Sequence, residues 1–164
     1  MVDTAREFLQ NITAGELADR VSQLRFAPHK PHAEPSFYEY SILRGVRLDS
    51  VRLDSTLYCS FTVPARLTDR NGKLSAGAIA SLVDEIGAAA IHKCGKPMDV
   101  SVDMSISYIS DAKMNDELEI TSRCLGQRGN YHSTGVLIRN RTTGEVVAQG
   151  RHSLFSLPVT ASKL

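Results

Sequence analysis

The chain has 164 residues, 42% of them hydrophobic, and a formal net charge of +1; this length is that of one domain and is enough to bury a core. A charge so close to zero excludes the long-range field that would recruit nucleic acid or an acidic membrane. No apolar run reaches the roughly 18 residues of a membrane span, and three cysteines without metal-ligand spacing indicate reduced thiols rather than disulfides or a metal site. We therefore expect a soluble intracellular protein with no nucleic-acid partner, no membrane span and no bound metal.

The first 36 residues are expected to form an N-terminal helical extension and a loop. Two helical patterns, at 3–12 and 16–26, are separated by Gly15. Residues 27–36 contain three prolines, which neither a helix nor a central strand tolerates. We expect the main domain at 37–158 and a short tail at 159–164.

Most of the remaining chain alternates with period two, which is typical of strands. The repeated "VRLDS" at 46–55 predicts one strand, a turn and the start of the next. Further strands are predicted at 100–109, 117–125 and on both sides of the turn at 141–144. In the first of these, Val102, Met104, Ile106 and Tyr108 share one face, whereas Ser101, Asp103, Ser105 and Ser107 share the other.

Between the second and third strands, residues 75–91 predict one long helix. Ser75 is a suitable N-cap, and Gly95 and Pro97 are expected to stop a helix of about 17 residues. Ile79, Leu82, Val83, Ile86 and Ala90 form one apolar stripe. The order of two strands, one helix and four strands indicates an α+β fold in which an antiparallel sheet of about six strands wraps around one central helix.

The other face of this helix carries Asp84 among small residues, namely Gly77, Ala80, Ser81, Gly87 and Ala88. One interpretation is that Asp84 and Glu85 are merely the solvent contact of the helix. The other follows from the small neighbours, which let a backbone or a ligand approach closely. A partly buried carboxylate without a nearby cation should have a raised pKa, which suits a general base.

Three segments carry a family resemblance: the helix motif at 74–87, "VSVDMSISYISDAK" at 100–113 and "TGEVVAQGRHS" at 143–153. They resemble the hotdog-fold acyl-CoA thioesterases, in particular the group that contains human thioesterase superfamily member 2. The resemblance covers residues 45–156 and implies the hotdog fold, a long helix wrapped by an antiparallel sheet. It agrees with the architecture that the periodicity predicts.

The resemblance also implies roles for site residues. The helix carboxylate, here Asp84, acts as general base or nucleophile on the thioester, and Ser101 helps to hold the attacking water. The helix N-terminus, at Ser75, Ala76 and Gly77, supplies a backbone N–H that polarises the thioester carbonyl. Arg151 and His152 match the family near its CoA-contacting surface, and Arg128 and Lys113 flank turns where a CoA phosphate could lie.

The segment before the helix departs from the family pattern Asn-x-x-Gly-x-x-His-Gly-Gly. Asp69 stands at the Asn position, Ser75 at the His position and Ala76 at the first Gly. The family histidine polarises the carbonyl, so this half of the chemistry is altered. A hydroxyl at Ser75 or the side chain of Asn71 could donate instead.

The distance along the helix between Asp84 and the N-cap predicts how the protein assembles. Asp84 lies nine residues after Ser75, which is about 13 Å along the helix axis and about half a turn out of phase. One thioester carbonyl cannot touch both positions within one chain, so we expect a site shared between subunits. This fits the homodimer, paired into a homotetramer, that the resemblance implies.

The expected function is hydrolysis of a fatty or aromatic acyl-CoA to the free acid and CoA, without a metal or redox cofactor. One alternative is a non-catalytic hotdog protein that binds acyl-CoA or only assembles. Another is a hotdog dehydratase, which would need a histidine that Ser75 removes. The final tripeptide Ser162-Lys163-Leu164 is the address that the peroxisomal import receptor reads, so we expect the peroxisomal matrix rather than the cytoplasm.

Overall fold

The computed structural model describes residues 2–13, 15–23, 37–92 and 99–156. Its two compact units are Met1–Phe37 and Tyr38–Leu164. The first contains the two helices that the periodicity predicted, α1 (Val2–Thr13) and α2 (Glu16–Ser22). They are separated at Gly15, which has a φ of 99° that favours glycine. The predicted loop at 27–36 and the C-terminal tripeptide lie outside the described residues.

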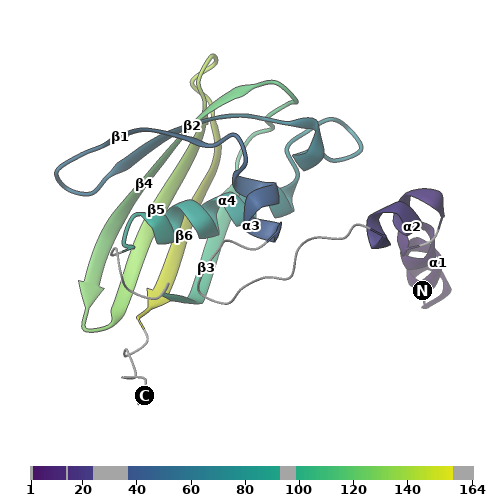
Figure 1. The fold of residues 1–164 in the computed structure, drawn as a ribbon, viewed down its shortest axis with the longest axis horizontal. Helices are drawn as coiled ribbons and strands as arrows, with labels where there is room; N and C mark the ends of the chain where they lie inside the picture. The colour runs from purple at the N-terminus through teal and green to yellow at the C-terminus, as the bar shows by residue number, and fades with distance from the viewer. Residues whose placement is uncertain (1, 14, 24–36, 93–98, 157–164) are drawn as a thin grey trace. The chain divides into compact units, whose positions relative to one another are not determined.

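The second unit is a six-stranded antiparallel sheet that curves around one helix, α4 (Figure 1). This is the architecture that the sequence predicted. A short helix, α3 (Phe37–Leu43), precedes the strands, whose order across the sheet is β1-β2-β4-β5-β6-β3. The strands are β1 (Arg47–Val51), β2 (Leu57–Thr62), β3 (Val100–Tyr108), β4 (Glu117–Arg128), β5 (Tyr131–Asn140) and β6 (Val146–Phe155).

Helix α4 (Ala76–Ala89) begins where the sequence predicted and ends earlier. The Oγ of Ser75 accepts a hydrogen bond from the backbone N–H of Ala78 at 3.2 Å, so Ser75 is the N-cap. The helix has 14 residues and its C-cap is Ala90, so the expected length of about 17 was too long. Three consecutive alanines give no local stop signal, which is why the sequence pattern extended the helix toward the next glycine.

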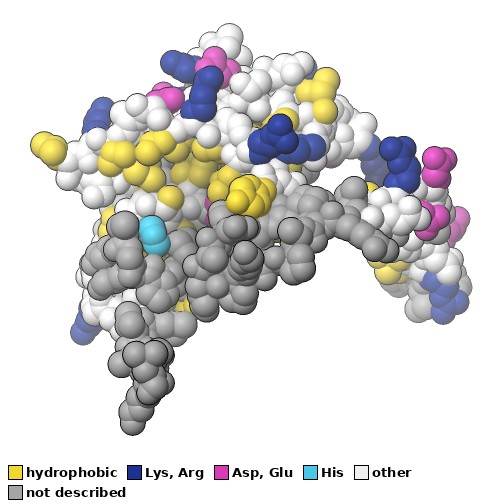
Figure 2. Space-filling model, viewed as in Figure 1, with side chains coloured by type: hydrophobic (Ala, Val, Ile, Leu, Met, Phe, Trp, Pro, Cys, Tyr) yellow, Lys and Arg dark blue, Asp and Glu magenta, His cyan; other side chains and the backbone are white. Residues whose placement is uncertain are grey.

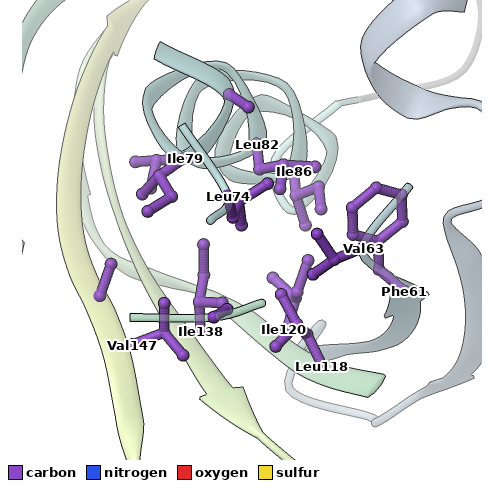
Figure 3. Close-up of a cluster of buried hydrophobic side chains, with 14 of the residues drawn as sticks. Phe61, Val63, Leu74, Ile79, Leu82, Ile86, Leu118, Ile120, Ile138 and Val147 are labelled. Atoms are coloured by element: carbon purple, nitrogen blue, oxygen red, sulfur yellow. The ribbon is translucent and has the colours of Figure 1, made fainter. Parts of the chain in front are cut away.

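The apolar stripe of α4 packs into the curved sheet, as predicted. Figure 3 shows Ile79, Leu82 and Ile86 pointing toward side chains of the sheet. Leu82 and Val83 are completely buried. A Cβ at Gly150 would lie 2.5 Å from Cγ1 of Val83, so only glycine lets the helix lie this close to β6. The core also contains Phe61, Val63, Leu74, Leu118, Ile120, Val136, Ile138 and Val147.

Strand β3 lies at one edge of the sheet and contains a β-bulge. It pairs with β6, and the register shifts between Ser101 and Asp103. Ser101 is paired with Leu154 and Met104 with His152, so Ser101 and Met104 lie on the same face, toward α4. The prediction that Ser101 shares a face with Asp103 and the following serines was therefore wrong, because the extra residue reverses the alternation.

The described residues were compared with the requirements of a membrane-spanning helix and of a metal site. None of their helices is long and apolar enough to cross a membrane, and none of their His, Cys, Asp and Glu side chains group as metal ligands. On the face shown in Figure 2, Lys and Arg side chains lie in small separate groups rather than in one basic patch. This distribution agrees with the near-zero net charge.

Candidate active site

Ser101 on β3 and His152 on β6 both contact one oxygen of Asp84 on α4. Ser101 on β3 donates its hydroxyl proton to Oδ1 of Asp84 across 3.1 Å. Nε2 of His152 on β6 lies 3.2 Å from the same oxygen and 2.9 Å from Oγ of Ser101. The bulge in β3 is what turns Ser101 toward the helix, and bulges commonly re-aim side chains beside active sites. Among the described residues, Oδ2 of Asp84 has no hydrogen-bond partner.

The burial of these groups differs sharply. The Asp84 side chain is 43% exposed, whereas His152 is fully buried. Burial lowers the pKa of His152, against the opposing effect of the nearby Asp84 carboxylate. A buried imidazole that is hard to protonate therefore supports a carboxylate that solvent can reach.

Most of the small residues around Asp84 are covered, as the second interpretation expected: Ser81, Gly87 and Ala88 are buried, whereas Gly77 is exposed. Part of the cover comes from the chain itself. The hydroxyl of Tyr38 on α3 lies 2.5 Å from Oγ of Ser81. A Cβ at Gly87 would lie 3.0 Å from Oγ1 of Thr134 and 3.1 Å from Nδ1 of His152. Glycine at 87 is thus what allows the helix to approach β5 and β6 so closely.

The neighbouring carboxylate, Glu85, lies in a different environment. Burial, followed by the charges of Glu39 and Asp84, raises its pKa to about 6. Among the described residues, Ser101 and His152 hydrogen-bond to Asp84 and to each other rather than to Glu85. The sequence argument expected a raised pKa at Asp84, and the raised pKa is found at the adjacent Glu85.

The N-terminus of α4 is open at the other end of β3. Ala76 and Gly77 are exposed, and a Cβ at Gly77 would meet no atom within 4 Å. The hydroxyl of Tyr108, near the end of β3, donates to the carbonyl of Ala76 at 3.4 Å. Thus β3 runs from Ser101, beside Asp84, to Tyr108, beside the helix N-terminus. Free N–H groups and the helix dipole make such an end suitable for a developing negative charge.

Comparisons with known proteins place this arrangement in a family. The model of the thioesterase superfamily matches residues 71–147. Mouse acyl-coenzyme A thioesterase 13 is 40% identical over 99 residues, which span 59% of this chain and 70% of that protein. The chain belongs to the thioesterase superfamily. It is a homologue of acyl-coenzyme A thioesterase 13, a thioester hydrolase.

Solved structures agree with this membership. The crystal structure of mouse thioesterase superfamily member 2 has a TM-score of 0.66 and 38% sequence identity, and the match covers 73% of this chain and 87% of that one. A thioesterase protein from Streptococcus pneumoniae, solved with coenzyme A, shares the fold with a TM-score of 0.62 and 22% identity over 68% of this chain and 87% of that one. The hotdog fold that the resemblance implied is confirmed.

The turn before α4 shows how this thioesterase departs from its family pattern. Oδ1 of Asp69 accepts hydrogen bonds from the backbone N–H groups of Asn71 and Lys73 at 2.8 and 3.0 Å. These bonds lower the pKa of Asp69, and its carboxylate is occupied in closing the turn. Asn71 is exposed at the tip of this turn. Ser75 uses its Oγ as a cap acceptor, which leaves its hydroxyl proton free to donate.

The four side chains expected at a CoA surface are not brought together within this thioesterase chain. Lys113 is exposed beside Lys73, near the helix N-terminus. Arg128 is exposed at the far end of the 12-residue strand β4. Arg151 is exposed on β6, opposite Gly135 and on the face away from α4.

The placement of His152 at a CoA-contacting surface was wrong, because its side chain is fully buried against Asp84 and Ser101. The period-two alternation of β6 could have predicted the burial of His152. Every second residue of this strand faces the helix, and the buried residues in that series are Ala148, Gly150, His152 and Leu154. The role of Tyr108 beside the helix N-terminus had no such signal.

Proposed function

We propose that this protein hydrolyses the thioester of a fatty or aromatic acyl-CoA, with Asp84 as the general base. The observation that carries the proposal is the fixed, half-exposed Asp84 carboxylate, whose Oδ1 is held by Ser101 while Oδ2 is left to accept a proton. Its support from comparison is the 40% identity to an acyl-coenzyme A thioesterase.

The proposed reaction needs only water and the thioester. Asp84 takes a proton from water as the water oxygen attacks the thioester carbonyl carbon, giving a tetrahedral intermediate with a negative oxygen. Backbone N–H groups at the N-terminus of α4 stabilise that oxygen. The C–S bond then breaks, and the departing thiolate receives the proton from Asp84. The products are the free acid and CoA.

The direct test is a panel of short, long and aromatic acyl-CoA substrates, with released thiol as the readout. We expect turnover of at least one class and saturation with substrate. Binding of acyl-CoA without thiol release from any member would favour a non-catalytic hotdog protein, the reading that Ser75 at the family histidine position supports.

We further propose that each site is shared between two copies of the chain, joined through β3. Among the described residues, no other strand pairs with the outer edge of β3, and Val102 and Tyr108 are 58% and 52% exposed. If two β3 strands pair antiparallel about a two-fold axis near Met104, Ser101 of one copy lies opposite the Tyr108 end of the other. The helix N-terminus beside that Tyr108 then comes close to Asp84 of the first copy.

A complementation experiment tests the shared site. Ala76→Pro removes the backbone N–H of Ala76, and proline is well tolerated at the first position of a helix; Ser75, with φ −68° and ψ 147°, already has the backbone that precedes proline. We expect Ala76→Pro and Asp84→Asn to be nearly inactive alone. Unfolding and refolding them together should restore about a quarter of wild-type activity, because half of the random dimers hold one intact site. Activity no greater than the sum of the two parents would refute the sharing.

We also propose the peroxisomal matrix as the location, from Ser162-Lys163-Leu164. A fluorescent reporter that carries the last ten residues should enter peroxisomes, and the same reporter with Leu164 deleted should not. A reporter that stays cytosolic with the intact tripeptide would remove this proposal.

A further inference from the structure

His152 is a buried group that the proposed reaction does not use. It is one of the largest fully buried side chains of the unit, so it cannot touch substrate. Its Nε2 lies 2.9 Å from Oγ of Ser101 and 3.2 Å from Oδ1 of Asp84. Nδ1 is buried with no hydrogen-bond partner among the described residues. Buried polar atoms are normally paired, so the one-sided bonding of this imidazole requires an explanation.

The geometry decides which nitrogen carries the proton. Oδ1 of the ionised Asp84 can only accept, and the Ser101 hydroxyl has a single proton to donate, which goes to Oδ1 at 3.1 Å. If Nε2 had no proton, two lone pairs would face each other across the 3.2 Å between Nε2 and Oδ1. A proton on Nε2 removes this repulsion, because N–H can donate to both Oδ1 and Oγ.

The other side of the ring supports the same tautomer. Nδ1 faces Gly87 closely, since a Cβ there would lie 3.1 Å from it. From β5 the neighbour is Thr134, whose hydroxyl donates to the backbone carbonyl of His152 at 3.3 Å. Among the described residues, a proton on Nδ1 would be a buried donor without a hydrogen-bond partner, although the backbone carbonyl of Asp84 also acts on the imidazole and favours its protonated form. Glu85, next to Asp84 on α4, has a pKa that is raised by burial and by the charges of Glu39 on α3 and of Asp84.

We propose that His152, as the neutral Nε2–H tautomer, is a positioning residue that holds Ser101 and Oδ1 of Asp84 in place for the reacting water. Two donors fix Oδ1, so Oδ2 is left as the proton acceptor. One lone pair of Oγ of Ser101 accepts from His152, and the other is free to accept from the water. The water can then donate to Ser101 and to Asp84 at once, with its own lone pair directed at the carbonyl. This inference rests on the proposed hydrolysis.

Two substitutions separate positioning from packing. Gln in place of His152 carries an amide N–H at about the reach of Nε2, whereas Asn ends at about the reach of Nδ1. We expect His152→Asn to lower kcat about 10- to 100-fold, as for groups that orient a metal ligand, with KM nearly unchanged. His152→Gln should recover most of kcat.

A matched control is His132→Gln. His132 is also buried on the face toward α4, at 5% exposure, and its Nε2 bonds Oγ of Ser156 at 3.1 Å rather than Asp84. We expect wild-type kcat from this variant. Equal kcat for folded His152→Asn and wild type would overturn the positioning role while the hydrolase remains.

The wild-type protein supplies a readout that does not depend on activity. The ¹⁵N imidazole spectrum should show His152 with a protonated Nε2 and a bare Nδ1, without titration from about pH 6 to about pH 8. A proton on Nδ1, or an imidazolium in this range, would overturn the inference even where His152→Asn does not fold. A wild type inactive on every acyl-CoA would overturn the proposed hydrolysis, and the spectrum would then decide the tautomer alone.

Discussion

Replacing Asp84 with asparagine removes one proton acceptor and little else. The two side chains have the same shape, and the amide oxygen can still accept from Ser101 and His152, which lie 3.1 and 3.2 Å from Oδ1. The new NH₂ group takes the place of Oδ2 on a side chain that is 43% exposed. We therefore expect the free energy of unfolding to change by less than about 1 kcal/mol, because no buried donor loses its partner.

The catalytic effect should be much larger than the structural one. Loss of a general base typically costs about 10² to 10⁴ in rate, and a 100-fold decrease corresponds to about 2.7 kcal/mol in the activation barrier. We expect kcat of Asp84→Asn to fall at least 100-fold on every acyl-CoA that the wild type hydrolyses. Thiol release under saturating substrate measures it, and urea unfolding checks the fold.

Glu85→Gln is the matched control, because it removes the same charge from the adjacent position on α4. Ser101 and His152 contact Asp84 rather than Glu85, so this variant should retain most of the wild-type kcat. The general-base role of Asp84 is refuted if folded Asp84→Asn hydrolyses the whole panel as fast as the wild type. Equal loss of activity in Asp84→Asn and Glu85→Gln would also contradict this role, because the loss of either negative charge on α4 would then be enough to explain it.

Two further predictions concern Glu85 and Ser75. The pKa of Glu85 is about 6 in the folded state against an ordinary value of 4.5, so the folded state holds the proton more tightly and stability falls as the pH rises from about 4.5 to about 6. The raised pKa of Glu85 corresponds to about 2 kcal/mol of free energy, reduced to about 1 kcal/mol for a half-exposed group. Glu85→Gln should therefore be more stable than wild type by about 1 kcal/mol at pH 7.5 but not at pH 4.5. Urea unfolding at the two pH values measures this difference. Ser75→His restores the family residue and should leave kcat/KM equal or higher, while loss of the N-cap lowers stability by about 1 kcal/mol; a folded Ser75→His with much lower kcat/KM would contradict the idea that the serine weakens carbonyl polarisation.

Local signals were sufficient for most of the fold. Ser75 caps α4 through a bond to Ala78, three residues away, and such short-range chemistry is visible in the sequence. The apolar stripe that includes Leu82 and Val83 is buried as its spacing predicted. The positions of the strands along the chain followed from turns and alternation, whereas the pairing of β3 with β6 instead of β4 did not. In each case the residues that determine the element lie within a few positions of each other.

The positions of Ser101 and His152 in the site could not be predicted from the alternation of side chains alone. One extra residue after Ser101 reverses which face each side chain occupies, and "VSVDM" has no glycine or proline to mark that bulge. His152 lies 68 positions beyond Asp84 in the sequence, and the two meet because α4 packs closely on β6. Family resemblance identified the carboxylate and the serine, but it assigned His152 to the wrong surface.

If the site is divided between two chains, as we propose, one half can change while the other is kept. The basic half is built within a single chain, from α4, β3 and β6, and Gly87 and the buried His152 tolerate little alteration there. In the proposed site, the carbonyl is polarised by backbone N–H groups at an open helix end, which any residue with an N–H supplies. Replacing histidine by Ser75 therefore removes one side-chain donor but keeps both the helix dipole and the N–H of Ala76. A hydrolase requires the closely packed carboxylate half of the site even when the other half changes. A protein that only binds acyl-CoA would not need that carboxylate half.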